Sequence, residues 1–194
     1  MGHIRKMNRG IFGQAEKRLG AARKKAAEIK NSRSLDEITE LWSEFLTEHS
    51  RFFNRLGNAM EAASEKGWFD RALAARKTDK TMSYLMHARN ADEHGHLTIT
   101  KIQPNGIALG TPKGFLHIEK MTFDAKGHIK ELRGWDGAPG RKIPVLFVPG
   151  EVMAINVMDR GQSYQPPEGI SSVPVLATVA VDYLESVLAA ARTL

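Results

Sequence analysis

Cysteine is absent from the 194 residues of this chain. The sequence therefore excludes disulfides, thiolate metal sites and a cysteine nucleophile. No uninterrupted apolar run approaches the roughly 18 residues that a membrane-spanning helix needs. The basic N-terminal stretch also lacks the apolar segment of a secretion signal. Together these absences predict a cytoplasmic protein that does not associate with membranes.

Positive charge is concentrated in the first 33 residues. They carry ten lysines and arginines against two glutamates, a net of +8, whereas the other 161 residues carry eighteen cations against twenty carboxylates, a net of −2. A basic segment attracts phosphate backbones by releasing their counterions. We therefore expect nucleic acid to bind here, through the side chains of Arg18, Arg23, Lys24 and Lys25. The alternative is a solvated helix face that only keeps the protein soluble.

The first half of the chain has the apolar period of helices. Residues 11–30 predict a helix whose apolar stripe is thin and mostly alanine, so we expect it to pack loosely or to become ordered on a partner. Ser34 and Glu37 form a capping box at the start of a stronger helix. Apolar residues recur every three or four positions from Leu35 to Leu56 and predict the main core element. His49 lies on that stripe, where a buried core histidine is expected rather than a ligand.

The period changes near the middle of the chain. A helix is predicted to begin at Thr78 or Asp79 and to end at Gly95, and short strands follow up to residue 170. A closing amphipathic helix begins near Pro174. Helices, sheet and helix in this order predict an α+β fold, with an antiparallel β-sheet inserted in a helical bundle. The expected segments form one compact domain: a basic arm (1–33), a helical core (34–95), a β insertion (96–170) and a C-terminal helix that packs on the core (171–194).

Strand pairing within the insertion is predicted from its turns. Residues 115–122 are expected to pair with residues 128–132, and residues 143–148 with residues 152–158 across Pro149 and Gly150. Two other segments are expected to lie outside the strands. Residues 134–140 contain three glycines and predict a loop, and residues 164–167 predict an extended linker.

Residues 87–94 carry the candidate reactive groups. Arg89 and Glu93 lie four residues apart, as do Asn90 and His94, so each pair shares a face of the predicted helix. A histidine can take a proton from a ribose 2′-OH or give one to the leaving oxygen. An arginine can hold the phosphate and stabilise the charge of the transition state. These groups suit RNA cleavage without a metal or another cofactor.

The six residues RNADEH, at positions 89–94, resemble the motif of the HEPN superfamily, in which an arginine and a polar residue precede a histidine by a short spacer. The resemblance implies a HEPN-like helical bundle that forms a homodimer. It further implies a metal-independent endoribonuclease of a toxin–antitoxin or phage-defence system, with a protein partner such as an antitoxin. In such an enzyme Arg89 would bind phosphate, Asn90 would assist it, and His94 would be the acid–base residue in a cleft between two copies.

Three alternatives remain open for this block. In the first, Arg89 and Glu93 form only a surface ion pair and His94 helps to close the helix. In the second, histidines and carboxylates near the helix end bind a metal, although their spacing matches no established ligand pattern (His87, His94 and His96 with Asp92 or Glu93). In the third, the chain is a non-catalytic HEPN-like scaffold that dimerises and binds nucleic acid or a protein.

Overall fold

The chain has a mixed α+β fold, as predicted, in a computed structural model that describes residues 9–95, 97–104, 106–109, 116–125, 127, 129–136 and 145–194. Five helices and eight strands lie within these residues. The helices are α1 (Arg9–Asn31), α2 (Leu35–Ala62), α3 (Lys66–Thr78), α4 (Lys80–Gly95) and α5 (Val173–Ala191). The strands are β1 (Thr100–Gln103), β2 (Gly106–Leu109), β3 (Leu116–Phe123), β4 (Ile129–Asp136), β5 (Val145–Val148), β6 (Glu151–Ala154), β7 (Val157–Asp159) and β8 (Gln162–Tyr164).

Two compact units divide the chain. The first contains Met1–Gln103 and Val152–Leu194, and the second contains Pro104–Glu151. The second unit is shorter at both ends than the predicted 96–170 insertion. The strands β7 and β8 therefore belong to the same unit as the helices.

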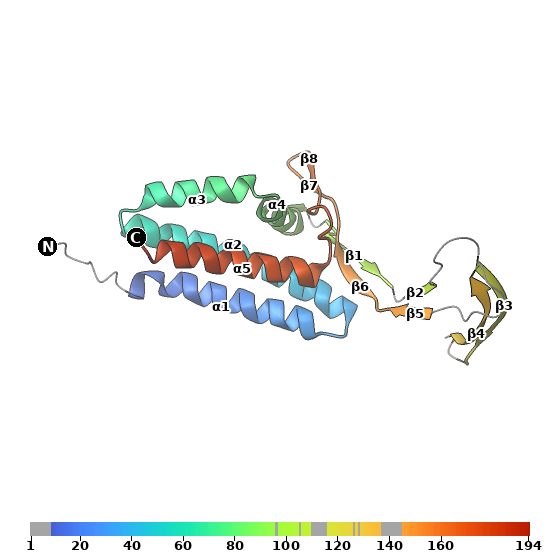
Figure 1. Ribbon diagram of the computed structural model, residues 1–194. Coiled ribbons are helices and arrows are strands. Elements are labelled where there is room, and N and C mark those ends of the chain that lie inside the picture. Colours follow the sequence, from blue (N-terminus) through green and yellow to red (C-terminus); the bar gives the residue numbers. More distant parts are fainter. Residues whose placement is uncertain are drawn as a thin grey trace. The chain divides into compact units, whose positions relative to one another are not determined.

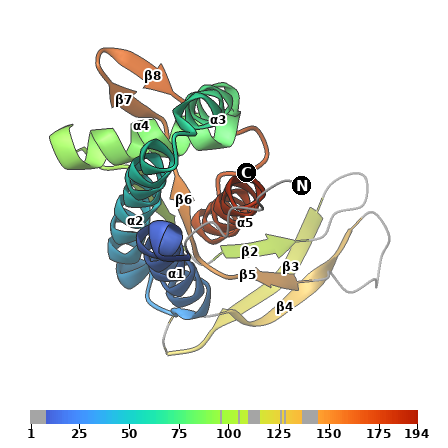
Figure 2. The same cartoon turned by 90° about the vertical axis from the view of Figure 1, so that its left-hand side faces the viewer.

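The helices α1, α2, α3 and α5 run side by side, whereas α4 crosses them (Figures 1 and 2). Because α1, α3 and α5 all pack on α2, the core of this unit lies around α2. The apolar stripe of α2 is buried as predicted from Ile38 to Leu56, whereas Leu35 at its start is only partly buried. The predicted members that are buried are Ile38, Leu41, Trp42, Phe45, Phe52, Phe53 and Leu56, and Leu46 is buried with them. Burial of this stripe is the main source of stability in the helical unit.

The start of α2 confirms half of the predicted capping box. The Ser34 hydroxyl accepts a hydrogen bond from the N–H of Glu37 at 3.2 Å, as expected. The Glu37 carboxylate instead accepts from the Ser32 hydroxyl at 2.5 Å, and the N–H of Ser34 donates to that same Ser32 hydroxyl at 3.1 Å. In a capping box the Glu37 side chain would accept from the N–H of Ser34. Here the Ser32 hydroxyl accepts that hydrogen bond instead.

His49 is buried in the core, as expected, but it is not the satisfied histidine that was expected there, because its Nε2 has no hydrogen-bond partner among the described residues. Its ring lies 6.3 Å from the ring of Phe45 and 5.6 Å from that of Phe53, measured between centroids. Burial, together with the nearby charge of Arg76, lowers the pKa of His49 to about 3. The imidazole is therefore neutral at physiological pH and acts as a packing group.

The expectation that α1 packs loosely is wrong. Its apolar stripe is buried against α2 and α5 (Phe12, Ala15, Leu19, Ala22 and Ile29). Alanines leave room for the backbones of neighbouring helices to approach closely, so a thin stripe can still be fully buried. The basic helix is thus part of the bundle rather than a separate arm.

Strand pairing follows the prediction for one hairpin only. β3 and β4 pair antiparallel, as expected. β5 pairs with β2 and β6 pairs with β1, so the predicted hairpin across Pro149 and Gly150 does not form. The outgoing strands β1 and β2 therefore pair with the returning strands β6 and β5, a non-local choice that short turn signals do not predict.

Two segments predicted as irregular belong in part to strands. β4 continues to Asp136, so residues 134–136 are strand rather than loop, whereas residues 137–140 lie outside the described part of the chain. Tyr164 ends β8, which pairs antiparallel with β7. Arg160 and Gly161 connect these two strands with φ values of 50° and 77°. Positive φ at both positions is what a two-residue hairpin turn of type I′ requires.

α5 is the one described helix with the length and composition of a membrane span, at a mean hydropathy of 1.6 over its most apolar window. It contains Asp182 and Glu185, and 44% of that window is buried inside the protein. The core helix of a bundle passes the same test, and α5 packs against α1 and α2. Pro174 lies in its first turn, as predicted.

Truncation of the α2 stripe tests this description of the core. Phe45→Ala or Phe52→Ala is expected to lower the free energy of unfolding by about 3–5 kcal/mol, because each removes a fully buried ring. Chemical denaturation followed by circular dichroism measures the change. Val175→Ala on α5 is the control: its side chain is exposed, and it is expected to change stability by less than about 0.5 kcal/mol. Equal effects in the core and control variants would contradict the core assignment.

Candidate functional site on helix α4

Two hydrogen bonds fix the start and the middle of α4. The Asp79 carboxylate accepts from the N–H of Met82 at 2.8 Å, so Asp79 rather than Thr78 caps the helix. The hydroxyl of Tyr84 donates to the carbonyl of Ile155 at 2.8 Å, and burial raises the pKa of this phenol. The second bond attaches α4 to the segment between β6 and β7.

A polar cluster, which we call the His87 cluster, joins α4 to the β7–β8 hairpin (His87, Asn90, Asp159 and Tyr164). One oxygen of Asp159 lies 2.7 Å from Nδ1 of His87 and accepts from Nδ2 of Asn90 at 3.0 Å. The rings of His87 and Tyr164 are stacked, with centroids 3.4 Å apart and planes at 12°. Figure 2 shows the hairpin beside α4.

The charge of Asp159 determines the proton arrangement in this cluster. Burial raises the pKa of Asp159, but hydrogen bonds from His87 and Asn90 outweigh it, so the pKa lies below its usual 3.8. The carboxylate is therefore ionised at neutral pH and can only accept hydrogen bonds. Nδ1 of His87 must then carry a proton, as in other carboxylate–imidazole pairs. The cluster is thus suited to hold α4 in position against the hairpin.

Arg89 lies between two partners on its own helix. Its guanidinium forms an ion pair with Glu93, as the four-residue spacing predicts, and Nη1 donates to the Asn90 side-chain oxygen at 3.4 Å. Its Nε is buried without a hydrogen-bond partner. Glu93 also accepts from the Thr47 hydroxyl of α2 at 3.4 Å. Arg89 is therefore oriented by its neighbours while part of its guanidinium remains accessible.

His94 differs from the rest of the motif. It is exposed in the last turn of α4, and it makes no hydrogen bond or ion pair with any other residue that the structure describes. Asn90 and His94, which were expected to share a face of the helix, therefore differ in their contacts. His87 and Asn90 bind Asp159, whereas His94 faces solvent.

Asp159 and Tyr164 were not predicted as site residues. Each is close to α4 only because the chain returns to the helical unit after the insertion, about 70 positions later. The sequence does hold one signal for this hairpin, namely glycine in the two-residue turn Arg160–Gly161 between short apolar and polar alternations. This local signal predicts the turn, but it does not predict that the hairpin packs against α4.

All four cations predicted to bind nucleic acid form ion pairs. Arg18 pairs with Glu48 at 3.0 Å, Arg23 with Glu185 at 2.6 Å, and Lys24 with Glu28 at 3.7 Å. Lys25 lies 2.6 Å from Glu44 and 2.9 Å from Glu28, and these hydrogen bonds raise its pKa. The charges of α1 are thus partly neutralised by Glu28 of the same helix and by acids of α2 and α5, although Arg23 and Lys24 remain exposed.

Metal ligands are not gathered anywhere in the described part of the chain. No three histidine, aspartate or glutamate side chains there lie close enough together to hold a metal ion. His96, a member of the histidine alternative, lies outside the described residues. His87 already uses Nδ1 to contact Asp159.

Comparison with known proteins adds no relative. No protein-family model, curated protein or solved structure matches the chain.

The role of Asp159 can be tested through the pH dependence of stability. A carboxyl whose folded-state pKa lies below the usual 3.8 stabilises the fold fully above that pH, and this contribution is lost as the pH falls through the folded-state pKa. Asp159→Asn is therefore expected to lower the melting temperature at neutral pH. The difference from the wild type should shrink in strongly acidic solution.

Thermal denaturation across a pH series measures this difference. Asp182→Asn is the control, because Asp182 is exposed and contacts no other described residue by a hydrogen bond or ion pair. It is expected to follow the wild type at every pH. A pH-independent effect of Asp159→Asn would contradict stabilisation by the ionised carboxylate.

Proposed function

We propose that the chain is a HEPN-like, metal-independent endoribonuclease that acts as a homodimer in the cytoplasm. The observation that carries the proposal is the exposed imidazole of His94, which has no partner among the described residues, at the end of the same helix that holds Arg89. Such an imidazole is free to exchange protons with a substrate. The His87 cluster and the Tyr84 hydrogen bond support the proposal because they hold that helix end in position.

Helical geometry favours two copies over one. Arg89 and His94 are five residues apart, which corresponds to about 140° of rotation and about 7.5 Å of rise on an α-helix. One copy therefore does not direct both groups at one phosphate from the same side. In a dimer, Arg89 of one copy and His94 of the other can flank the scissile phosphodiester.

The proposed reaction needs a base, an acid and a cation. One His94 takes the proton from the ribose 2′-OH, whose oxygen attacks phosphorus and forms a cyclic phosphate. The bond from phosphorus to the 5′ oxygen breaks, and the His94 of the second copy donates a proton to that oxygen. Arg89 stabilises the added negative charge on the phosphoryl oxygens, and Asn90 holds Arg89 through the contact at 3.4 Å.

Binding of RNA must displace Glu93 from Arg89. A partly exposed ion pair between i and i+4 contributes only about 0.5 kcal/mol, whereas a charge-assisted hydrogen bond contributes about 1.5–3 kcal/mol. The Arg89 and Glu93 side chains are 27% and 31% exposed, so solvent and substrate can reach the pair. Exchange of Glu93 for a phosphate is therefore favourable.

A non-catalytic scaffold is the second candidate, and a specific observation favours it. Arg89 already has two partners within its helix, and Asn90 is held by Asp159. With both side chains held by these partners, α4 could serve as a rigid face for a second copy, a nucleic acid or a protein such as an antitoxin. In that case His94 would contribute to an interface rather than to chemistry.

Cleavage of RNA in the presence of EDTA distinguishes the two candidates. Wild-type protein is expected to cleave RNA and to leave a 2′,3′-cyclic phosphate, whereas Arg89→Ala and His94→Ala should each lose at least about a hundredfold in rate. Labelled oligonucleotides and mass spectrometry of the products measure both effects. Arg71→Ala, which removes an exposed arginine of α3, should behave as wild type.

Glu93→Gln adds a comparison of RNA affinity. It removes the carboxylate that competes with phosphate for Arg89, so binding of RNA should strengthen while His94 remains in place.

Unchanged cleavage in His94→Ala would exclude this residue as the acid–base group. Inactivity of a folded wild-type dimer on all RNA tested would favour the scaffold.

The basic face of α1 is proposed to assist RNA binding without sequence preference. Substitution of glutamine for both Arg23 and Lys24 is expected to weaken binding and to reduce the slope of log affinity against log salt by about 1.4, at about 0.7 per phosphate contact. Fluorescence anisotropy over a salt series measures the slope. Lys77→Gln on α3 removes an exposed lysine outside α1 and should leave it unchanged. Equal slopes in the wild type and the α1 variant would assign these cations to structural ion pairs alone.

A further inference from the structure

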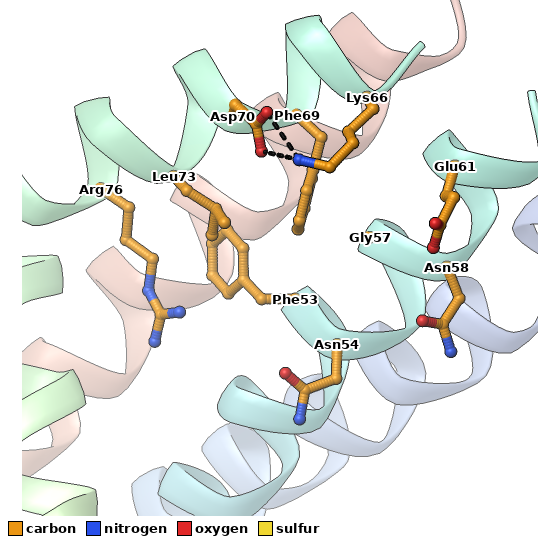
Figure 3. Close-up of a pocket in the computed structure, with 10 residues that line it drawn as sticks. All are labelled: Phe53, Asn54, Gly57, Asn58, Glu61, Lys66, Phe69, Asp70, Leu73 and Arg76. Atoms are coloured by element: carbon orange, nitrogen blue, oxygen red, sulfur yellow. Dashed lines mark hydrogen bonds and ion pairs between the residues drawn. The ribbon is translucent and has the colours of Figure 1, made fainter. Parts of the chain in front are cut away.

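A cavity of about 460 Å³ lies between α2 and α3, away from the α4 residues (Figure 3). Apolar side chains of both helices line it, chiefly Phe53, Phe69 and Leu73. Gly57 faces the Phe69 ring so closely that a Cβ at this position would lie 2.7 Å from a ring carbon. The volume is within the range of pockets that bind small organic molecules.

Arg76 of α3 lines this cavity, and its side chain extends beside the Phe53 ring (Figure 3). It is only 8% exposed, and its guanidinium carbon lies 4.0 Å from the centre of the Phe53 ring. The side chain makes no ion pair or hydrogen bond with any residue in the described part of the chain, and its Nε is buried without a partner. Burial lowers the pKa of Arg76 to about 10, so the guanidinium is still charged at neutral pH.

A buried charge without a counter-ion is costly, and proteins rarely retain one. The ring of Phe53 compensates part of the cost through a cation–π contact. It leaves the planar N–H donors of the guanidinium unused, and these match a carboxylate in geometry. The cavity therefore presents a binding group for an anion that no residue in the described part of the chain supplies.

The other charged groups of the cavity limit the charge of that anion. Lys66 is already paired with Asp70 at 2.8 Å, and Glu61 adds a further carboxylate. Lys66 and Arg76 are ten residues apart on α3, or about 15 Å along its axis. A ligand with a second anionic group, or a phosphate dianion, would meet carboxylates without a free cation to balance them.

We propose that this cavity binds a small organic monocarboxylate with an apolar body. Arg76 binds the carboxylate through two parallel hydrogen bonds, while Phe53, Phe69 and Leu73 contact the apolar body. Asn54 and Asn58 of α2 line the same cavity and provide amide groups for a polar substituent. Neither Arg89 nor His94 lines this cavity, so the ligand site is separate from the proposed reaction centre.

Binding of 4-phenylbutyrate to the full chain tests the proposal, with the uncharged 4-phenylbutyramide as the matched compound. Calorimetry and NMR are expected to show that the carboxylate binds at least about tenfold more tightly than the amide, since the amide lacks the charge that Arg76 recognises. The NMR signals of the Phe53 and Phe69 rings and of the Arg76 Nε–H group should shift on binding.

Variants of Arg76 provide the decisive comparison. Arg76→Met should lower the affinity for 4-phenylbutyrate at least about tenfold. Arg76→Lys should also weaken binding, because an ammonium group cannot form the two parallel hydrogen bonds that a guanidinium forms with a carboxylate. Arg71→Met is the control, because Arg71 is exposed on the same helix and does not line the cavity. Equal affinity for the acid and the amide, no binding at all, or equal losses in the Arg76 and Arg71 variants would each overturn the proposal. The comparison of the two compounds on wild-type protein decides it even if the Arg76 variants fail to fold.

Discussion

Burial of the aromatic stripe on α2 is the constraint on which the rest of the helical unit depends. Trp42, Phe45, Phe52 and Phe53 are all nearly or fully buried, and α1, α3 and α5 pack around them. Because apolar burial is not directional, a helix with few large apolar residues, such as α1, can still pack against this stripe. The same packing encloses His49 and Arg76, and it therefore produces both a neutral histidine and a buried cation.

The position of α4 depends on a second, directional set of contacts. Asp159 joins His87 and Asn90, and Tyr84 binds the backbone of Ile155. Hydrogen bonds to an ionised carboxylate have demanding geometry, so they orient the helix in a way that apolar packing alone would not. This arrangement explains why Arg89 and His94 can occupy defined places at a helix end that is otherwise exposed.

Arg89 and Arg76 both have a buried Nε, but they differ in whether a counter-ion is already bound. Arg89 has Glu93 as a counter-ion, so an RNA phosphate would have to replace an existing interaction. Arg76 has an aromatic ring but no counter-ion within the described residues, so a carboxylate would add an interaction that is missing. The proposed reaction centre and the proposed ligand cavity therefore differ in their energetics as well as in their location.

Local patterns in the sequence determined the helices, the α+β class, the buried role of His49, the β3–β4 hairpin and the Arg89–Glu93 pair. Each depends on neighbours within a few residues, where helical or strand geometry is sufficient. Tertiary structure alone decided the tight packing of α1, the pairing of β1 with β6, the approach of Asp159 to His87, and the isolation of Arg76 between two helices. These contacts join positions distant in the chain, and their free energy depends on which surfaces remain to be buried once the α2 core has formed.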